Sequence, residues 1–417
     1  MTIPNTKIIE GFILASKRIT FIIILFFLYI MSLFNHVHFH EFFRNKELNH
    51  FYSAVAIMTF ADSLINIFVP IYLFQLNYPI YSIIFFYFLV SFSFVIFSYP
   101  GAKIVSKIGV KHAILYSTPF LIAFYLGLRI INQHSWIFFL LPILLSWRMI
   151  LYNYGYHLNY IVHSDSKNRG KEVSFLAGLA IVVHVLSPLI GGFIALYAGF
   201  QVLYIIGSIL LVAGTIPLFF SKDKYESLKF TRKDLWKAIF SKKEKGTLIS
   251  FSGYAIESII GRTIWPIFLI TVLISISKTG IVVTLSMIIS LLVFYFIGKI
   301  TDKYNKIKLL KFGTLLYFFA WIGRVFADST LKIFVVDSYK NVAEKVLHIP
   351  WSTKTYDLAL RRGYFRFLVG REIIFNFSRI IIMPFLMLLF YFDIYPILIS
   401  FILAAIFSLG YIFLDDK

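Results

Sequence analysis

Ionisable and amide side chains recur at helical spacing inside apolar stretches of this 417-residue chain. One series, with separations of four, three and four positions, consists of Asp337, Asn341, Glu344 and His348. In a helix these residues share one face, and Lys340 lies within reach of Asp337 or Glu344. Such a stripe can bind a polar or zwitterionic solute or relay a proton. A buried salt-bridge network is the other interpretation that the pattern allows.

A second series, in the following apolar stretch, consists of Arg371, Glu372, Asn376 and Arg379. Here we favour a structural salt-bridge network over a binding site. The remaining polar positions of interest in apolar stretches are Asp62, Asn66, Arg148, Tyr152, Tyr156, His184, Glu257, Ser258, Arg262 and Arg324. Glu257 and Arg262 are expected to face different ways, because five positions turn a helix by about 140°.

Charged groups at the centre of a membrane cost about 2.5–3.5 kcal/mol each, so they usually face other protein segments or a wet cavity. Burial favours the protonated form of a carboxyl group. The candidate proton carriers are therefore Asp62, Glu257, Asp337, Glu344 and Glu372. His184 is expected to be a structural hydrogen-bonding partner. Arg324 is expected to extend its side chain to the nearer membrane surface.

Composition indicates that membrane-spanning helices position these residues. Hydrophobic residues make up 59% of the chain and charged residues 14%, whereas soluble domains contain about 45–50% and about 25%. The net charge of +20 indicates basic loops that face anionic membrane lipids, and no nucleic-acid partner is expected. The absence of Cys excludes disulfides and thiolate metal sites, and neither a metal nor a cofactor is expected.

A span of about 30 Å requires about 20 apolar residues, which predicts twelve helices in two six-helix bundles. The first bundle, 51–220, would hold helices at 51–75, 80–100, 113–131, 136–158, 173–196 and 199–220. The second, 247–417, would hold helices at 247–275, 279–299, 311–328, 329–349, 366–392 and 394–414. The basic linker between them, 221–246, is expected to be cytoplasmic and to form an interfacial helix.

Lys and Arg concentrate in alternate loops, and the opposite loops carry only Arg129, Lys278 and Lys332. Because cytoplasmic loops carry the basic excess, we expect a multi-pass cell-membrane protein with a cytoplasmic C-terminus. Residues 1–50 form an N-terminal extension with one more apolar segment, Ile19–Phe34. This segment is expected to be an embedded or interfacial helix, with a thirteenth span as the alternative.

The sequence also contains a weak internal repeat. A shift of 196 positions superimposes the loops 102–107 and 298–303 and two pairs of prolines, Pro70 with Pro266 and Pro188 with Pro384. With six helices each, both halves would insert in the same orientation. The prolines interrupt helical hydrogen bonding, and we expect bends in the first, fifth, seventh and eleventh helices.

The loop after the eighth helix, Gly298-x-x-x-Asp302-Lys303-x-Asn305-Lys306, resembles the loop motif of the major facilitator superfamily. Its copy after the second helix is Ala102-x-x-x-Ser106-Lys107-x-Gly109-x-Lys111. Pro188-x-x-Gly191-Gly192 resembles the superfamily's Gly-Pro-x-x-Gly-Gly motif on the fifth helix. Together with the predicted topology, the resemblance covers residues 50–414.

This resemblance implies a cavity lined by the first, fourth, seventh and tenth helices, with the two motif loops as cytoplasmic gates. The motif's Asp is implicated in charge contacts that hold the cytoplasmic side closed. Ser106 replaces it in the first loop, so Asp302 would have to carry that role. Both loops are equally compatible with tight, solvated turns.

We therefore expect a monomeric secondary active transporter that moves a small solute by alternating access, with proton coupling as a hypothesis. The alternative is a lipid-handling or flipping protein on the same scaffold, which the 19% aromatic content would suit. An enzyme is not expected, because the sequence contains neither a His-Glu-x-x-His motif nor a nucleophile elbow. The substrate does not follow from the sequence.

Overall fold

The computed structural model describes the backbone of residues 46–163, 169–221, 223–301 and 306–414. Side chains are described in the same ranges, except at 46–49, 160–182 and 290–306. The predicted segment Ile19–Phe34 and the loop residues Asp302 and Lys303 lie outside the described residues.

Helices occupy every range between 51 and 414 in which the sequence predicted a span. In the first half they are α3 (Lys46–Asn66), α4 (Phe68–Gln75), α5 (Ile80–Ile108), α6 (Val110–Ile130), α7 (Ile137–His163), α8 (Arg169–Tyr197) and α9 (Gly199–Phe219). After the linker helix α10 (Arg232–Ile239) and the 3-10 turn η1 (Lys242–Glu244), the second half begins. It contains α11 (Lys245–Leu273), α12 (Ile276–Thr301), α13 (Lys306–Arg324), α14 (Thr330–Arg361), α15 (Tyr364–Tyr391), α16 (Pro396–Ser408) and η2 (Leu409–Phe413).

Eight helical stretches of the described residues are long and apolar enough to cross a membrane. The protein is therefore an all-helical, multi-pass membrane protein, while the count of twelve spans stays a prediction. The first predicted span consists of two helices, α3 and α4, which a turn at Ile67 separates just before Pro70.

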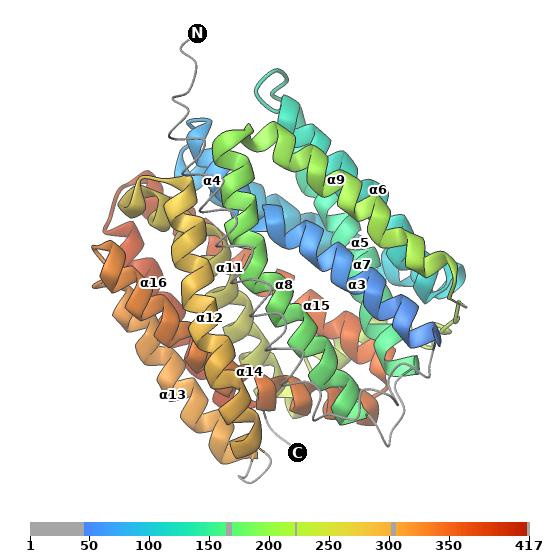
Figure 1. The fold of residues 1–417 in the computed structure, drawn as a ribbon. Helices are drawn as coiled ribbons and strands as arrows, with labels where there is room; N and C mark the ends of the chain where they lie inside the picture. The colour runs from blue at the N-terminus through green and yellow to red at the C-terminus, as the bar shows by residue number, and fades with distance from the viewer. Residues whose placement is uncertain (1–45, 164–168, 222, 302–305, 415–417) are drawn as a thin grey trace.

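Helices of the two halves gather on opposite sides of the molecule (Figure 1). The largest contacts between the halves are made by α8 with α12 and by α5 with α15. Contacts between α4 and α11 join the halves at the end where the basic loops are absent.

Glycines allow α8 to pass close between two neighbours. A Cβ atom added to Gly280 of α12 would lie 2.5 Å from the carbonyl oxygen of Pro188 in α8. Gly192 packs against Gly280 itself, whereas Gly191 faces α3, where an added Cβ would collide with the carbonyl oxygen of Leu64. The glycines of the fifth-helix motif thus serve a backbone-to-backbone contact.

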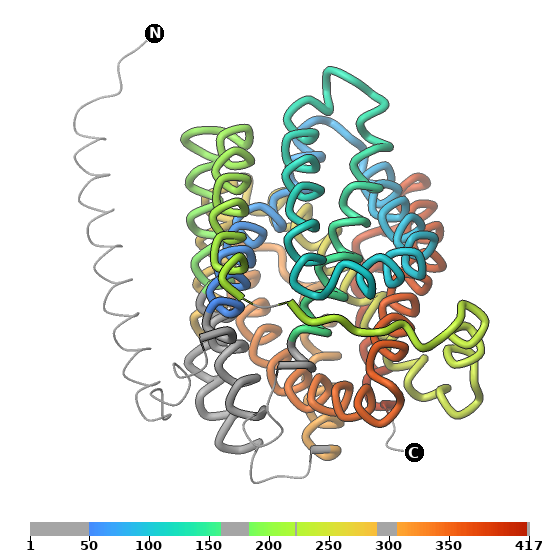
Figure 2. Tube along the Cα trace, turned by 90° about the vertical axis from the view of Figure 1, so that its right-hand side faces the viewer, coloured from blue at the N-terminus to red at the C-terminus, as the bar shows by residue number. Residues whose placement is uncertain are grey.

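The linker crosses from the first half to the side of the second half (Figure 2). Its helix α10 begins with a reciprocal cap, because the side chains of Thr231 and Asp234 each accept a bond from the other's backbone amide. These bonds from Thr231 hold the pKa of Asp234 below its ordinary value. The apolar face of α10, with Leu235 and Ile239 buried, packs against α15.

The start of the linker is tied to the first motif loop by Asp223. Its carboxylate accepts hydrogen bonds from the backbone amides of Lys111, at 2.8 Å, and His112, and it pairs with the His112 ring. The backbone amide of Val110 donates to the carbonyl oxygen of Lys224 at 2.9 Å. Asp223 therefore caps the N-terminus of α6 from a distant part of the chain.

This cap depends on Gly109, whose φ of 90° an L-residue rarely adopts and whose missing side chain leaves room for the Asp223 carboxylate. Ser106, in the same loop, bonds only locally, to the carbonyl oxygen of Lys103 at 2.9 Å. The carboxylate at this loop thus comes from Asp223 of the linker. At the position where the family motif carries its own Asp, this chain has Ser106.

We expect Asp223→Ala to lower the stability of the purified protein by about 1–2 kcal/mol, because a helix cap and an ion pair are lost together. The midpoint of thermal unfolding measures this effect. Gly109→Ala should give a similar loss while leaving the carboxylate in the chain. Asp328→Ala, which removes an exposed loop carboxylate, is the matched control; equal losses in Asp223→Ala and Asp328→Ala would contradict the capping role.

Candidate functional site

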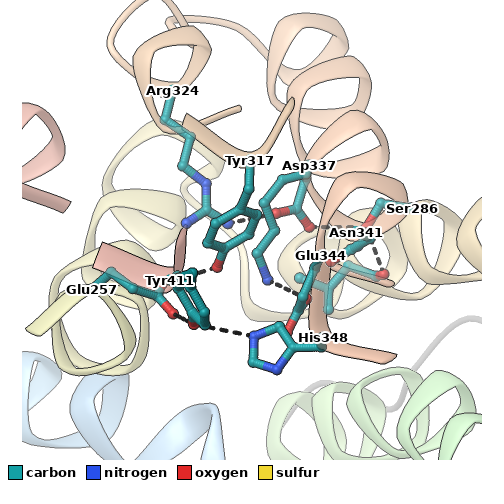
Figure 3. Close-up of polar contacts among 11 residues, drawn as sticks. Glu257, Ser286, Tyr317, Arg324, Asp337, Asn341, Glu344, His348 and Tyr411 are labelled. Atoms are coloured by element: carbon teal, nitrogen blue, oxygen red, sulfur yellow. Dashed lines mark hydrogen bonds and ion pairs between the residues drawn. The ribbon is translucent and has the colours of Figure 1, made fainter. Parts of the chain in front are cut away.

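The first polar cluster of the second half centres on Asp337 (Figure 3). Its carboxylate accepts from Arg324 at 2.9 Å and from the Ser286 hydroxyl at 2.9 Å, and the Asn341 amide donates to Ser286 at 3.1 Å. All four side chains are buried. This cluster joins α12, α13 and α14 through one ion pair and two hydrogen bonds.

Arg324 does not extend to the membrane surface, so the prediction for this residue was wrong. It is 2% exposed, and its guanidinium group lies 3.9 Å from the ring centre of Trp265 and 4.4 Å from that of Trp321. The Asp337 carboxylate and the faces of the two Trp rings compensate its charge within the protein, so the side chain does not need to reach the membrane surface. The Nε and Nη1 atoms have no hydrogen-bond partner among the described residues.

A second cluster surrounds the buried Glu257 of α11. The Tyr317 hydroxyl donates to one carboxylate oxygen at 2.9 Å, and the Tyr411 hydroxyl donates to the other at 2.8 Å. Nε2 of His348 lies 3.2 Å from the Tyr411 hydroxyl, which links α14 to the same carboxylate. No basic side chain among the described residues forms an ion pair with Glu257.

Lys340 and Glu344 form an ion pair of 2.7 Å on α14, and both side chains remain partly exposed. The Lys340 ammonium also lies 6.0 Å from the ring centre of Tyr317. The predicted stripe on α14 therefore divides. Asp337 and Asn341 bond to neighbouring helices, while Glu344 and Lys340 remain accessible to solvent.

The first half has a smaller centre made by Asp62 of α3 and Arg148 of α7. Arg148 donates to one Asp62 oxygen at 3.1 Å, and the Tyr125 hydroxyl donates to the other at 3.0 Å. The guanidinium group lies 4.5 Å from the ring centre of Tyr152. Arg148 and Glu344 coincide under the shift of 196 positions, but their partners Asp62 and Lys340 fall on Ser258 and Leu144, so the two ion pairs are not equivalent.

Helix α15 carries a further group of charged side chains. Arg371 binds Glu372 at 2.8 Å, and Asn153 of α7 donates to the same carboxylate at 3.2 Å. Asn376 donates to the Glu372 carbonyl oxygen at 2.9 Å. All three side chains of α15 are buried, and the Asn153 bond joins the two halves.

Arg379, also on α15, bonds to α11 instead. Its guanidinium group donates to the Ser258 hydroxyl at 3.2 Å and to the Ala255 carbonyl oxygen at 3.5 Å. A further bond between the halves joins Nδ1 of His157 to the Tyr356 hydroxyl at 2.9 Å. The halves are thus connected by uncharged as well as charged contacts.

The side chains of Asn66 on α3, His184 on α8 and Arg262 on α11 are exposed. His184 bonds through Nδ1 to the Ser63 hydroxyl at 2.8 Å, as its predicted structural role would require. It also lies within electrostatic range of Lys345, Asp62, Glu344 and Arg262.

The remaining predicted residues lie as follows. Pro188, Pro266 and Pro384 are each inside one continuous helix, and Pro70 is inside α4, one turn after the break at Ile67. Lys107 is exposed in the last turn of α5, and Gly298 lies within α12. No group of three metal-ligating side chains occurs among the residues with described side chains.

Sequence reasoning missed the tyrosines that hold the carboxylates: Tyr125, Tyr317 and Tyr411. They are three of 26 tyrosines, and nothing in the spacing distinguishes them. It also missed Lys345, although this residue lies on the α14 face between Asn341 and His348 and helical spacing could have found it.

Comparisons with known proteins agree on one fold. Residues 158–338 match the family model of the Major Facilitator Superfamily. The structure is similar to that of the nucleoside transporter NupG, with a TM-score of 0.62 and 12% identity over 88% of this chain and 98% of that one. A D-xylose-proton symporter gives 0.62 and 14%, over 86% of this chain and 96% of that one.

A bacterial metal transporter gives a TM-score of 0.60 at 12% identity, over 89% of this chain and 99% of that one. A search of the curated proteins returns no match. At these identities the solved structures establish the fold, and each of the three transports a different kind of solute according to its name.

Proposed function

We propose that this chain is a transporter of the major facilitator superfamily, as its partial match to the family model and its fold support, and that it moves a small polar solute across the cell membrane by alternating access. The solute would bind between the halves, near the middle of the membrane. The basic loops and the C-terminus would face the cytoplasm, and the chain would act as a monomer with lipids as its surroundings.

The observation that carries this proposal is the ion pairs held within the helices of both halves. Asp62 pairs with Arg148 in the first half and Glu344 pairs with Lys340 in the second, and the side chains of both pairs remain partly exposed. Charged side chains deep in a membrane protein usually line a wet, functional region. A purely structural network would bury these groups completely.

Proton coupling is proposed for Glu257. Each of the other four candidate carriers has a cation as its partner: Asp62 with Arg148, Asp337 with Arg324, Glu344 with Lys340 and Glu372 with Arg371. A fixed cation favours the charged carboxylate, whereas Glu257 is held by two hydroxyl groups alone. It can therefore gain and lose a proton without breaking an ion pair.

Proteoliposomes that contain the full-length protein and a trapped pH indicator test this proposal. Xylose, uridine, succinate and inorganic phosphate serve as probe solutes. For the transported probe, we expect the wild type to move protons with it and Glu257→Gln to lose this movement by about tenfold or more. Exchange of labelled for unlabelled probe, which moves no net proton, should persist in Glu257→Gln.

Asp357→Asn is the control, because it removes a carboxylate that is exposed at the basic end of α14. Proton movement of wild-type size in Glu257→Gln would remove Glu257 as the carrier. Failure of every probe to exchange in the wild type, tested alongside a broader extract of metabolites, would count against transport itself.

Lipid handling remains the alternative function. An apolar groove lined by Ile108, Trp147 and Leu151 is open to the surroundings. However, it is formed by α5, α6 and α7 of the first half, away from the charged residues between the halves. The transporter proposal explains those charges, and the groove does not require a lipid substrate.

A further inference from the structure

The carboxylate of Glu257 is covered by its two tyrosine partners. Glu257 is 3% exposed, and Tyr317 and Tyr411, whose hydroxyl groups bind its two oxygens, are 2% and 0% exposed. A proton moves between groups that lie within hydrogen-bond reach of each other. With its surface covered in this way, Glu257 exchanges a proton through one of these two hydroxyl groups.

The two hydroxyl groups differ in what lies beyond them. The Tyr317 hydroxyl makes no hydrogen bond to a described residue other than Glu257, so this branch ends there. The Tyr411 hydroxyl donates to Glu257 at 2.8 Å and also lies 3.2 Å from Nε2 of His348. Within the described part of the chain, the hydrogen-bonded path from Glu257 therefore continues through Tyr411 to His348 (Figure 3).

The hydrogens on this path can be assigned by counting donors. A tyrosine hydroxyl has one hydrogen, and Tyr411 donates it to the Glu257 carboxylate. Its oxygen must then accept from His348, which places a hydrogen on Nε2 of the neutral imidazole ring. The three groups form a chain in which each one donates to the next.

The outer end of the path is Nδ1 of His348. This atom bonds to no described side chain, and it is not one of the buried unpaired polar atoms found among the described residues. It therefore belongs to the accessible part of this half-buried side chain. Glu344 and Lys345, both half-buried, precede His348 by four and three residues and lie on the same side of α14.

Aromatic packing holds the His348 ring in position for proton transfer. Its centre lies 5.6 Å from that of the Trp351 ring and 5.7 Å from that of the Tyr254 ring. The Trp351 indole is itself fixed by a hydrogen bond of 2.9 Å to the Ser250 hydroxyl. The His348 ring therefore keeps Nε2 next to Tyr411, and it can pass a proton from one nitrogen to the other side without rotating.

We propose that His348 and Tyr411 form the relay that loads and unloads the proton of Glu257. This inference rests on the proposed proton coupling and deepens it. A hydronium ion gives a proton to Nδ1 of His348 and becomes water, the Nε2 proton passes to the Tyr411 oxygen, and the Tyr411 hydroxyl proton passes to Glu257. One N–H bond and one carboxyl O–H bond form, one N–H bond breaks, and the Tyr411 hydroxyl is regenerated. The reverse sequence releases the proton and restores the original imidazole tautomer.

The proteoliposome assay tests the relay when net proton movement is divided by exchange of the same probe, chosen from xylose, uridine, succinate and inorganic phosphate by its transport in the wild type. This ratio corrects for the amount of folded protein. We expect His348→Gln and Tyr411→Phe each to lower the ratio by about tenfold or more, since each interrupts the path while Glu257 stays in place.

The control is His134→Gln, which replaces an exposed histidine in the loop before α7. We expect its ratio to stay within about twofold of the wild type.

Two comparisons distinguish a relay from a structural role. Tyr317→Phe removes an equivalent hydrogen bond from the same carboxylate outside the path, so it should lower the ratio less than Tyr411→Phe does. His348→Glu and His348→Gln introduce side chains of nearly equal size, but only the carboxyl group can take up and release a proton. The ratio in His348→Glu should therefore lie severalfold above that in His348→Gln.

A wild-type ratio in His348→Gln or in Tyr411→Phe would overturn the relay. Equal losses in His348→Gln and His348→Glu, or in Tyr317→Phe and Tyr411→Phe, would overturn it as well. Each of these results would leave Glu257 as the carrier and remove only the route to it. If the wild type moves no protons with the probe, or if Glu257→Gln moves as many as the wild type, the proposed coupling fails and the relay fails with it.

Discussion

Replacing Asp337 by Asn is expected to destabilise the protein by about 3–5 kcal/mol, because it leaves the buried Arg324 without its anion. Arg324 is 2% exposed, so bulk solvent does not reach it to replace the lost carboxylate. The faces of Trp265 and Trp321 compensate only part of the charge. The midpoint of thermal unfolding, followed by Trp fluorescence in detergent, measures the effect.

The double variant with Asp337→Asn and Arg324→Gln distinguishes an unpaired charge from a change of shape. Removing both charges should recover most of the stability, since exchanging a buried ion pair for neutral groups is often nearly neutral. If the double variant unfolds at the same temperature as Asp337→Asn, the ion pair is not the reason for the loss.

Gly280→Val is expected to reduce transport by about tenfold or more while the protein still inserts and folds. The added side chain would start 2.5 Å from the carbonyl oxygen of Pro188, and a backbone atom cannot rotate away. Helices α8 and α12 would have to separate where the two halves make one of their largest contacts. Exchange of the transported probe in proteoliposomes measures the loss.

Gly323→Val is the matched control, because a Cβ atom there would meet only side-chain carbons of Val336, at 3.6 Å. We expect its exchange rate to stay within about twofold of the wild type. Gly280→Ala should give an intermediate loss. Normal exchange in Gly280→Val would show that the close approach of α8 and α12 is dispensable for movement of the halves.

Hydropathy located the helices but not all of their ends. The tenth predicted helix ends at 349, whereas α14 continues through Pro350 to Arg361, and α5 extends from the predicted 100 to Ile108. The length criterion counts only the apolar residues that cross the hydrocarbon core. Helices continue beyond the core with polar residues, and the criterion does not include these. Helix α14 continues past Pro350, although proline lacks the amide hydrogen that would donate to the carbonyl oxygen one turn earlier in the helix.

The candidate site was predictable residue by residue only where both partners lie on one helix. The spacing of Lys340 allowed a pair with Asp337 or with Glu344, and the structure contains the pair with Glu344. Partners on different helices, such as Tyr411 for Glu257 or Arg324 for Asp337, depend on how helices pack. A single sequence contains no direct signal for that packing. The expectation that Arg324 extends to the membrane surface was wrong for the same reason.

The linker has a mechanical consequence for how far the basic ends of the halves can move apart. One of its ends is fastened to α6 through Asp223, and the other to α15 through α10, which begins after Thr231. Eight residues, 224–231, follow Asp223 up to the start of α10. A fully stretched chain spans about 3.3–3.6 Å per residue, so this segment reaches about 26–29 Å at most. The linker therefore limits how far the two halves can separate on this side. It permits an opening of up to this length and resists a larger one.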